Sequence, residues 1–195
     1  MVPRTPLVVL LGGPNGAGKS TGAARMLRGA LAVDEFVNAD TIALGLSAYR
    51  PGDAAIAAGR VMLERLRFLA RDGRDFAFET TLAGRGHLRW VSELRARGYR
   101  AHLLFLSLPS ADLAVARVAE RVRKGGHHVP EDAVRRRFAA GLRNLFTRVD
   151  GAVDSWQVYD NSEFPPPRLI ASRSSEMRIL IEDSRAWDNL KEQLE

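Results

Sequence analysis

A glycine-rich segment that ends in a lysine and a serine has the clearest chemical meaning in the sequence. The residues Gly13-Pro14-Asn15-Gly16-Ala17-Gly18-Lys19-Ser20 match the pattern G-x-x-x-x-G-K-[ST] at every position. Glycines let the backbone curl so that successive amide groups hold phosphate oxygens. Lys19 adds positive charge beside the β- and γ-phosphates, and the Ser20 hydroxyl is a ligand for Mg²⁺. The segment, with Thr21 after it, predicts a nucleoside-triphosphate site.

An aspartate and a glutamate each follow an apolar run that predicts a strand. Asp40 follows one such run, and Glu79 follows residues 76–78 and precedes Thr80 and Thr81. Ligands of doubly wound sheets bind at the carboxyl ends of the strands, so both acids are expected near the phosphates.

Each acid has two interpretations. Asp40 is placed to accept a proton from an acceptor hydroxyl or to hold a Mg²⁺-bound water, and it is equally suited to N-cap a helix that begins at Thr41. Glu79, Thr80 and Thr81 are suited to hydrogen bonds with sugar hydroxyls, and the alternative is a polar turn. For Glu79, an apolar strand that ends in an acid facing the phosphate loop favours the site.

One segment, from Arg117 to Arg137, is rich in arginine. Arg117 and Arg121 are four residues apart and therefore share one face of a helix. Gly125-Gly126 then interrupts the helical pattern, which predicts a lid over about 121–137. Such a lid excludes water and brings guanidinium groups to the transferring phosphoryl group. The alternative is a solvated basic face with ion pairs four residues apart.

The elements that position these residues are visible as apolar runs alternating with stretches of helical period. This alternation predicts an α/β fold with a mainly parallel sheet. The predicted strands are 7–11, 36–37, 76–78, 102–108, 156–159, 169–170 and 177–181. The predicted helices lie over 56–70, 88–94, 110–123 and 134–145.

Three prolines at 165–167 predict the end of the central unit, because a proline run is a stiff, extended break. Residues 1–167 are therefore expected to form one domain that carries the phosphate loop. Residues 168–195 are expected to form a strand-and-helix appendage that packs on the same domain.

Composition excludes several classes of protein. The chain of 195 residues has no cysteine, which excludes a disulfide scaffold, a thiol nucleophile and cysteine-ligated metal sites. The net charge is +6, but the basic residues are spread along the chain and aromatic residues make up only 7%, which argues against a nucleic-acid partner. No apolar run approaches the roughly 20 residues of a membrane-spanning helix, and the protein is expected to be cytoplasmic.

Other users of a phosphate loop fit less well than a small-molecule kinase. A GTPase usually carries an N-K-x-D motif, which the sequence lacks. A motor or AAA-type ATPase usually ends a later strand with an acid for Mg²⁺, whereas residues 102–108 are followed by Pro109 and Ser110.

Taken together, these residues resemble the short, zeta-toxin-like P-loop kinases. The resemblance covers most of residues 7–170 and is carried by six segments in the same order. They are GGPNGAGKST (12–21), FVNAD (36–40), AAGR around Arg60, FAFETTLAGR (76–85), RVAERVRKGGHHVPEDAVRRRF (117–138) and DSWQVYDNS (154–162).

The resemblance implies a nucleotide-kinase-like, three-layer α/β/α fold with a central, mainly parallel sheet of five strands. It also implies ATP-dependent phosphorylation of a hydroxyl group, with ATP and Mg²⁺ as cofactors. The best-known zeta toxins phosphorylate UDP-N-acetylglucosamine. An antitoxin partner is compatible with the resemblance, although no antitoxin-binding extension is recognisable in the sequence.

The resemblance also implies a role for each candidate residue. Asp40 is the general base, while Lys19 and Ser20 hold the triphosphate and Mg²⁺. The acceptor side comprises Asp40, Arg60, Glu79, Thr80 and Thr81. The nucleotide and phosphate side adds Arg117, Arg121, Arg137 and, near the adenine, Asn161.

Two alternatives remain beside a nucleotide-sugar kinase. One is a kinase of another acceptor, such as a nucleoside, an antibiotic or an RNA end. The other is a nucleotide-gated binding module with slow ATP hydrolysis.

Overall fold

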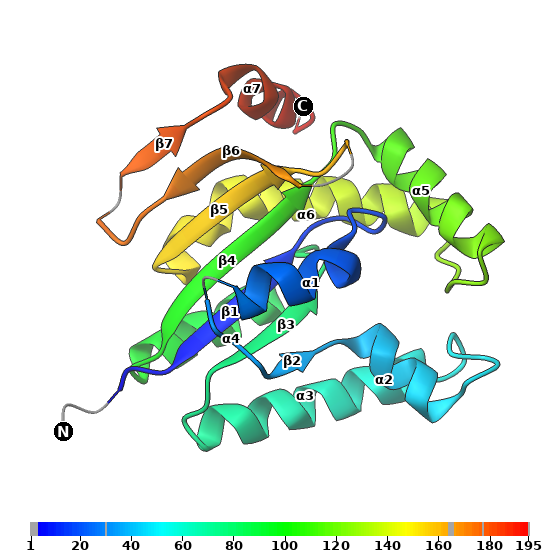
Figure 1. Ribbon diagram of the computed structural model, residues 1–195, viewed down its shortest axis with the longest axis horizontal. Coiled ribbons are helices and arrows are strands. Elements are labelled where there is room, and N and C mark those ends of the chain that lie inside the picture. The colour runs from blue at the N-terminus through cyan, green and yellow to red at the C-terminus, as the bar shows by residue number, and fades with distance from the viewer. Residues whose placement is uncertain (1–3, 30, 164–165, 177, 195) are drawn as a thin grey trace.

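The apolar runs of the sequence assemble into one central sheet (Figure 1). The computed structural model describes residues 4–29, 31–163, 166–176 and 178–194. The strand order is β2-β3-β1-β4-β5-β6-β7, in which β1 to β5 pair parallel and β6 and β7 pair antiparallel at one edge. The strands are β1 (Leu7–Gly12), β2 (Phe36–Val37), β3 (Phe76–Thr80), β4 (Arg100–Ser107), β5 (Ser155–Asp160), β6 (Arg168–Arg173) and β7 (Ile179–Ile181).

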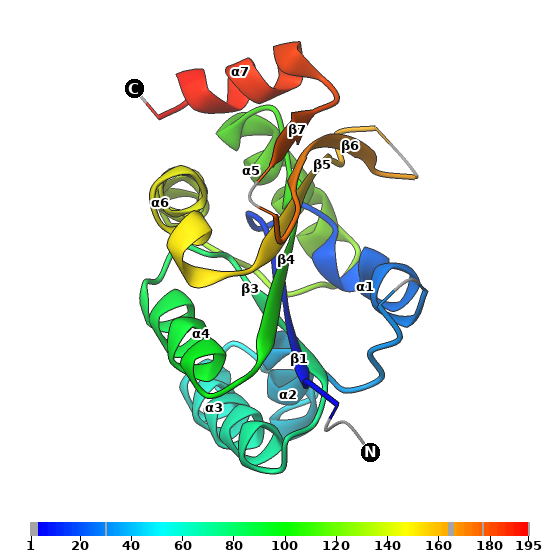
Figure 2. The same cartoon turned by 90° about the vertical axis from the view of Figure 1, so that its left-hand side faces the viewer.

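Helices cover both faces of the sheet, which gives the expected three-layer α/β/α fold. Figure 2 shows α1 on one face and α4 and α6 on the other. None of the described helices has the length and apolar character needed to cross a membrane. The helices are α1 (Lys19–Arg28), α2 (Ala39–Leu46), α3 (Ala55–Arg71), α4 (Gly86–Ala96), α5 (Ala111–Arg123), α6 (Glu131–Ala152) and α7 (Ser184–Glu192).

Strand β1 lies in the middle of the parallel region and is buried on both faces. Residues 8–11 are 0% exposed, as continuous apolar sequence predicts for a parallel strand covered by helices. Gly12, at the end of β1, lies opposite Thr80 of β3 and Phe105 of β4. The segments that follow these strands therefore leave the sheet at the same edge.

The sheet has seven strands where the family resemblance implies five, because the C-terminal segment extends it. Strand β6 pairs with β5, and β7 pairs with β6. Trp187 of α7 stacks on Trp156 of β5 with ring centroids 5.7 Å apart, so an apolar contact holds α7 against the sheet. Pro165, in the predicted break, and Met177, in the last predicted strand, lie outside the described residues.

Two partly buried histidines make the stability of this fold depend on pH. Burial lowers the pKa of His87 and of His102 below the ordinary value for histidine. The unfolded chain then binds these protons at a higher pH than the folded chain does. Their contribution to stability is therefore complete above the unfolded pKa of about 6.5 and is lost as the pH falls below it.

We expect the midpoint of thermal unfolding to decrease between about pH 7.5 and about pH 5.5. His102 Nδ1 lies 2.7 Å from Ser155 Oγ, so His102→Gln keeps a polar partner for that serine while removing the titration. The decrease should be smaller in the His102→Gln protein. An identical pH profile for both proteins would show that His102 does not contribute.

Candidate active site

The glycine-rich segment forms a loop between β1 and α1 whose shape depends on glycine. Gly13 has a φ of +140°, and a Cβ atom there would lie 2.3 Å from the Leu106 carbonyl oxygen. Gly18 has a φ of +79°, and a Cβ there would lie 2.7 Å from Asn161 Nδ2. The loop is therefore pressed against the ends of β4 and β5. Because α1 begins directly after it, the positive end of that helix faces the loop.

Lys19 is buried at the start of α1, with 5% of its surface exposed. Its Nζ donates to the carbonyl oxygens of Gly13 (2.9 Å) and Pro14 (2.8 Å) and lies 3.5 Å from Glu79 Oε1. Burial lowers the pKa of Lys19, while the negative charges of Glu79 and Asp40 act in the opposite direction. A phosphate group at this position would further favour the charged form, which suits the lysine to anion binding.

A hydrogen-bonded cluster joins the end of β3 to the start of α1. Ser20 Oγ donates to Glu79 Oε2 (2.7 Å), and Asn38 Nδ2 donates to the same oxygen (2.6 Å). The other Glu79 oxygen faces Lys19. The structure thus places Glu79 beside the lysine and serine of the loop, whereas the sequence suggested contact with the acceptor.

Asn38 connects this cluster to α2, and the sequence analysis did not single it out. Asn38 Oδ1 accepts a hydrogen bond from the Thr41 amide (3.0 Å), so Asn38 is the N-cap of α2. The alternative interpretation of Asp40 as the cap is therefore wrong. Asp40 lies in the first turn of α2 and is exposed. The sequence signal for this cap is an asparagine directly before a helical stretch.

The oxygen atoms gathered here suit Mg²⁺. Ser20 supplies a hydroxyl, and Glu79 and Asp40 supply carboxylates, all of which are donors that Mg²⁺ prefers. Within the described ranges, no three His, Cys, Asp or Glu side chains gather closely enough to hold a metal ion. Phosphoryl-transfer sites need only one or two protein ligands, because phosphates and waters supply the rest. The side chains therefore fit Mg²⁺ bound together with a nucleotide.

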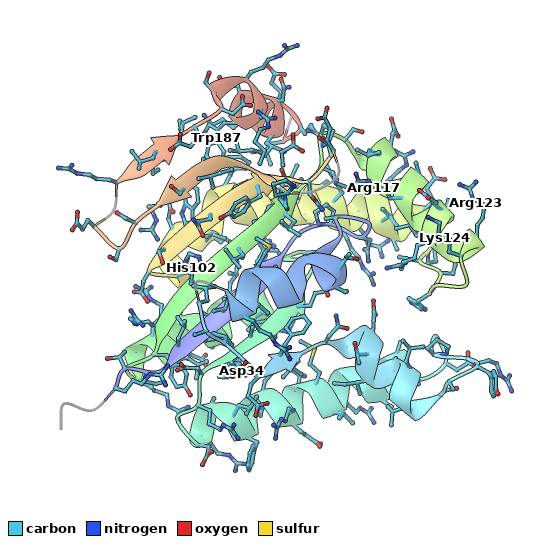
Figure 3. The ribbon with its side chains drawn as sticks, viewed as in Figure 1. Asp34, His102, Arg117, Arg123, Lys124 and Trp187 are labelled. Carbon is cyan, nitrogen blue, oxygen red and sulfur yellow. The ribbon has the colours of Figure 1, made fainter. Side chains whose placement is uncertain are left out.

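Arg117 of α5 ties the end of β5 to the phosphate loop (Figure 3). Its two terminal nitrogens donate to the carbonyl oxygens of Asn161 and Ser162, each at 2.6 Å. Asn161 Nδ2 in turn donates to the Ala17 carbonyl oxygen (2.8 Å). Arg117 therefore acts on the site through the segment that carries Asn161, in addition to lining the cavity with its own charge.

Arg117→Ala should loosen this segment and weaken nucleotide binding. Two charge-assisted hydrogen bonds are lost, each worth about 1–3 kcal/mol, so the free energy of unfolding should fall measurably. The KM for ATP should rise several-fold, because Asn161 is no longer held against the loop. Arg123→Ala, on the same helix but exposed, is the matched control and should change neither value. Equal effects of the two substitutions would contradict this role for Arg117.

Arg121 lies one helical turn further along α5 and faces the same site. Its Nη2 atom donates to the His127 carbonyl oxygen (2.8 Å), and this hydrogen bond stabilises the segment between α5 and α6. Its positive charge is one of the causes that lower the pKa of Lys19. Among the described residues, Arg121 Nε and Asn15 Oδ1 are buried without a hydrogen-bond partner. Both residues also line the cavity described next.

A cavity of about 600 Å³ joins these groups, a volume suited to a small-molecule ligand. Figure 1 shows the glycine-rich loop at the carboxyl edge of the sheet, with α5 on one side of it and α2 on the other. The predicted site residues that line the cavity are Asn15, Gly16, Gly18, Lys19, Ser20, Thr21, Asp40, Glu79, Arg117, Arg121 and Asn161.

Gly13, Pro14 and Ala17 belong to the loop but do not line the cavity, and four predicted site residues outside the loop do not line it either. Thr80 Oγ1 accepts from the Leu82 amide (3.0 Å) and lies 3.2 Å from His87 Nδ1, so it is engaged in the turn after β3. Arg60 is exposed on α3, and Thr81 and Arg137 are half-buried away from the cavity lining. Sequence spacing could not show whether the helix faces that carry Arg60 and Arg137 lie toward the phosphate loop.

Comparison with protein families places the chain in one of them. A family model described as an AAA domain matches residues 8–146, which is most of the chain. An uncharacterized protein of Haemophilus influenzae (strain ATCC 51907 / DSM 11121 / KW20 / Rd) is 31% identical over 128 residues, covering 65% of this chain and 88% of that protein. The sequence argued against a motor or AAA-type ATPase. In the structure β4 ends at Ser107, and the acid beside Ser20 comes from the neighbouring strand β3 as Glu79.

Solved structures share the fold at low sequence identity. The AvrRxo1-ORF1:-ORF2 structure with ATP has a TM-score of 0.72 and 15% identity, and the match covers 96% of this chain and 64% of that chain. The chain thus spans less than two thirds of AvrRxo1. The structure from the PezAT toxin-antitoxin system of Streptococcus pneumoniae has a TM-score of 0.65 and 16% identity, covering 98% of this chain and 88% of that chain.

A gluconokinase from Sinorhizobium meliloti has a TM-score of 0.51 and 14% identity, covering 96% of this chain and 93% of that chain. These likenesses agree with the α/β fold described above. The chain belongs to the family described as an AAA domain, and its α/β P-loop kinase-like fold is shared with the PezAT structure and the gluconokinase.

Proposed function

We propose that this protein is an ATP-dependent kinase that transfers the γ-phosphate to a hydroxyl group of a nucleotide sugar such as UDP-N-acetylglucosamine. The observation that carries the proposal is the convergence of Lys19, Ser20, Glu79 and Asp40 on one cavity. An anion-binding loop and an exposed carboxylate face each other there, which is the arrangement that phosphoryl transfer to a hydroxyl requires.

The nucleotide side of the site is formed by the loop and the residues that brace it. The loop amides, the start of α1 and the Lys19 ammonium group bind the phosphates and stabilise the charge that develops during transfer. Mg²⁺, when bound beside Ser20, supplies further charge neutralisation on the β- and γ-phosphates. Glu79 orients Ser20 through their 2.7 Å hydrogen bond and so acts on this side of the reaction. Arg121 adds positive charge from the lid, and Asn161 lies toward the adenine.

The acceptor side is formed around Asp40. As the acceptor oxygen forms its bond to the γ-phosphorus, the bond from that phosphorus to the bridging β–γ oxygen breaks. The hydroxyl proton moves to an oxygen of the Asp40 carboxylate. Asn38 keeps that carboxylate at a fixed place relative to the loop, because it caps α2 and bonds to Glu79 at the same time.

The choice of acceptor rests on the motif set, which resembles that of the zeta-toxin-like P-loop kinases. PezAT is a toxin-antitoxin system, so we include an antitoxin among the proposed partners of this protein, with the cytoplasm as the proposed compartment. Gluconate, nucleosides and RNA ends are the competing acceptors.

Mass spectrometry of one reaction mixture tests the proposal. Native and Asp40→Asn proteins are incubated with Mg²⁺-ATP, UDP-N-acetylglucosamine, gluconate, a pool of nucleosides and a short RNA. We expect UDP-N-acetylglucosamine to gain one phosphate with the native protein only. If another compound gains the phosphate, the kinase stands and the nucleotide sugar is wrong. If ATP is hydrolysed at a slow rate that no acceptor raises, a nucleotide-gated binding module replaces the kinase.

A further inference from the structure

The outer edge of β7 is apolar and open. It is the last strand of the sheet, and no described residue pairs with its outer side (Figure 1). The side chains of Ile179, Leu180 and Ile181 are 48%, 58% and 48% exposed. Sheet edges are usually protected from pairing by short strand length or by charges, prolines or bulges within the strand. Strand β7 is short, but its three residues include no charge, proline or bulge, so this edge is suited to accept another strand.

The hydrogen bonds to β6 show which backbone groups point outward. The Ser174 amide donates to the Arg178 carbonyl oxygen (3.2 Å), and the Glu182 amide donates to the Ile170 carbonyl oxygen (2.8 Å). Backbone groups alternate in direction along a strand, so Leu180, midway between Arg178 and Glu182, also bonds toward β6. The amide and carbonyl groups of Ile179 and Ile181 therefore point away from the sheet and are available to a further strand.

The sequence around β7 is complementary to itself. It reads Arg178-Ile179-Leu180-Ile181-Glu182, with an apolar centre and opposite charges at the two ends. In an antiparallel pair of two such segments centred on Leu180, each arginine lies opposite the glutamate of the other copy, and isoleucine lies opposite isoleucine. Arg178 and Glu182 are both exposed, so their side chains are accessible to a second copy.

Only this register both pairs opposite charges and lets the outward main-chain groups of the two copies form hydrogen bonds. With Leu180 opposite Leu180, the outward groups of Ile179 and Ile181 form four main-chain hydrogen bonds between the copies. A shift of the centre by one residue keeps outward groups facing each other but places a charged side chain opposite Leu180. We propose that the protein forms a twofold symmetric dimer in which β7 pairs antiparallel with β7 of a second copy, joining two sheets into one.

The dimer should be visible by sedimentation velocity of the full chain at about 100 μM, with dissociation on dilution. Ile181→Pro removes an outward amide, which donates only to the second copy, and should leave a monomer that still unfolds cooperatively. A native protein that stays monomeric at this concentration overturns the proposal. A dimer that survives Ile181→Pro also overturns it, because another surface must then hold the copies together.

Charge reversal tests the register. Arg178→Glu places a glutamate opposite Glu182 at both ends of the interface, and should raise the dimer dissociation constant by about tenfold or more. The double substitution Arg178→Glu with Glu182→Arg restores opposite charges and should recover dimerisation. Because neither residue touches the phosphate site, ATP should stabilise all these variants against heat as it does the native chain. If Arg178→Glu disrupts the dimer and the double substitution does not restore it, this register is rejected.

Discussion

The Asp40→Asn protein should bind ATP as the native chain does but transfer phosphate about 10²–10⁴ times more slowly. The substitution keeps the size and polarity of the side chain and removes its ability to accept the hydroxyl proton. Asp40 is exposed in the first turn of α2, and its carboxylate does not cap the helix, so α2 should remain folded. The measurement is single-turnover phosphoryl transfer beside equilibrium binding of ATP.

Asp34→Asn is the matched control for Asp40, since Asp34 is an exposed aspartate in the segment before β2 (Figure 3). It should leave both transfer and binding unchanged. If Asp40→Asn instead weakens ATP binding and spares the transfer rate of the bound complex, Asp40 acts on the nucleotide or its metal. The general-base role would then be withdrawn while the phosphate site remains.

The Lys19→Ala protein should lose nucleotide binding and turnover together. Lys19 is buried beside the loop carbonyls, and it is the cation closest to Glu79 in the cluster. Its removal leaves the phosphates without their buried positive charge, and losing one such preorganised group costs about 10²–10³ in rate. Addition of Mg²⁺-ATP should raise the melting temperature of the native protein and leave that of Lys19→Ala unchanged.

Lys191→Ala is the control for the loss of one lysine. Lys191 lies on α7, where it pairs with Asp188 and approaches the Trp187 ring, away from the phosphate site. This variant should keep the ATP-dependent rise in melting temperature. If Lys19→Ala keeps that rise as well, the glycine-rich loop does not bind the triphosphate, and both the nucleotide site and the proposed kinase fail.

Local sequence features were enough to predict the parallel core. The apolar runs that become β1, β3 and β4 are continuous because each strand is covered by helices on both faces. The loop from Gly13 to Ser20 was equally recognisable, because each glycine and the lysine are required by the chemistry of the loop itself. The two additional strands were not predicted as part of the sheet. Strand β6 pairs with β5 and β7 pairs with β6, and a short apolar run does not encode such long-range pairing.

The position of each acid at the site was predictable only in part. The sequence placed Asp40 and Glu79 at strand ends, and both line the same cavity. It did not show that Glu79 would accept hydrogen bonds from Ser20 and from Asn38. The direction of a side chain at a strand end depends on the backbone of the following turn and on neighbours distant in the chain.

The sequence by itself determined the α/β class, the phosphate loop and the order of motifs, because these follow from local composition and periodicity. Tertiary structure alone decided which arginines reach the cavity. Arg117 and Arg121 line the cavity beside the loop, whereas Arg60 and Arg137 do not. It also decided that β7 forms an open edge of the sheet. These features depend on how helices pack across the sheet and on long-range strand pairing, which residue spacing within one segment does not specify.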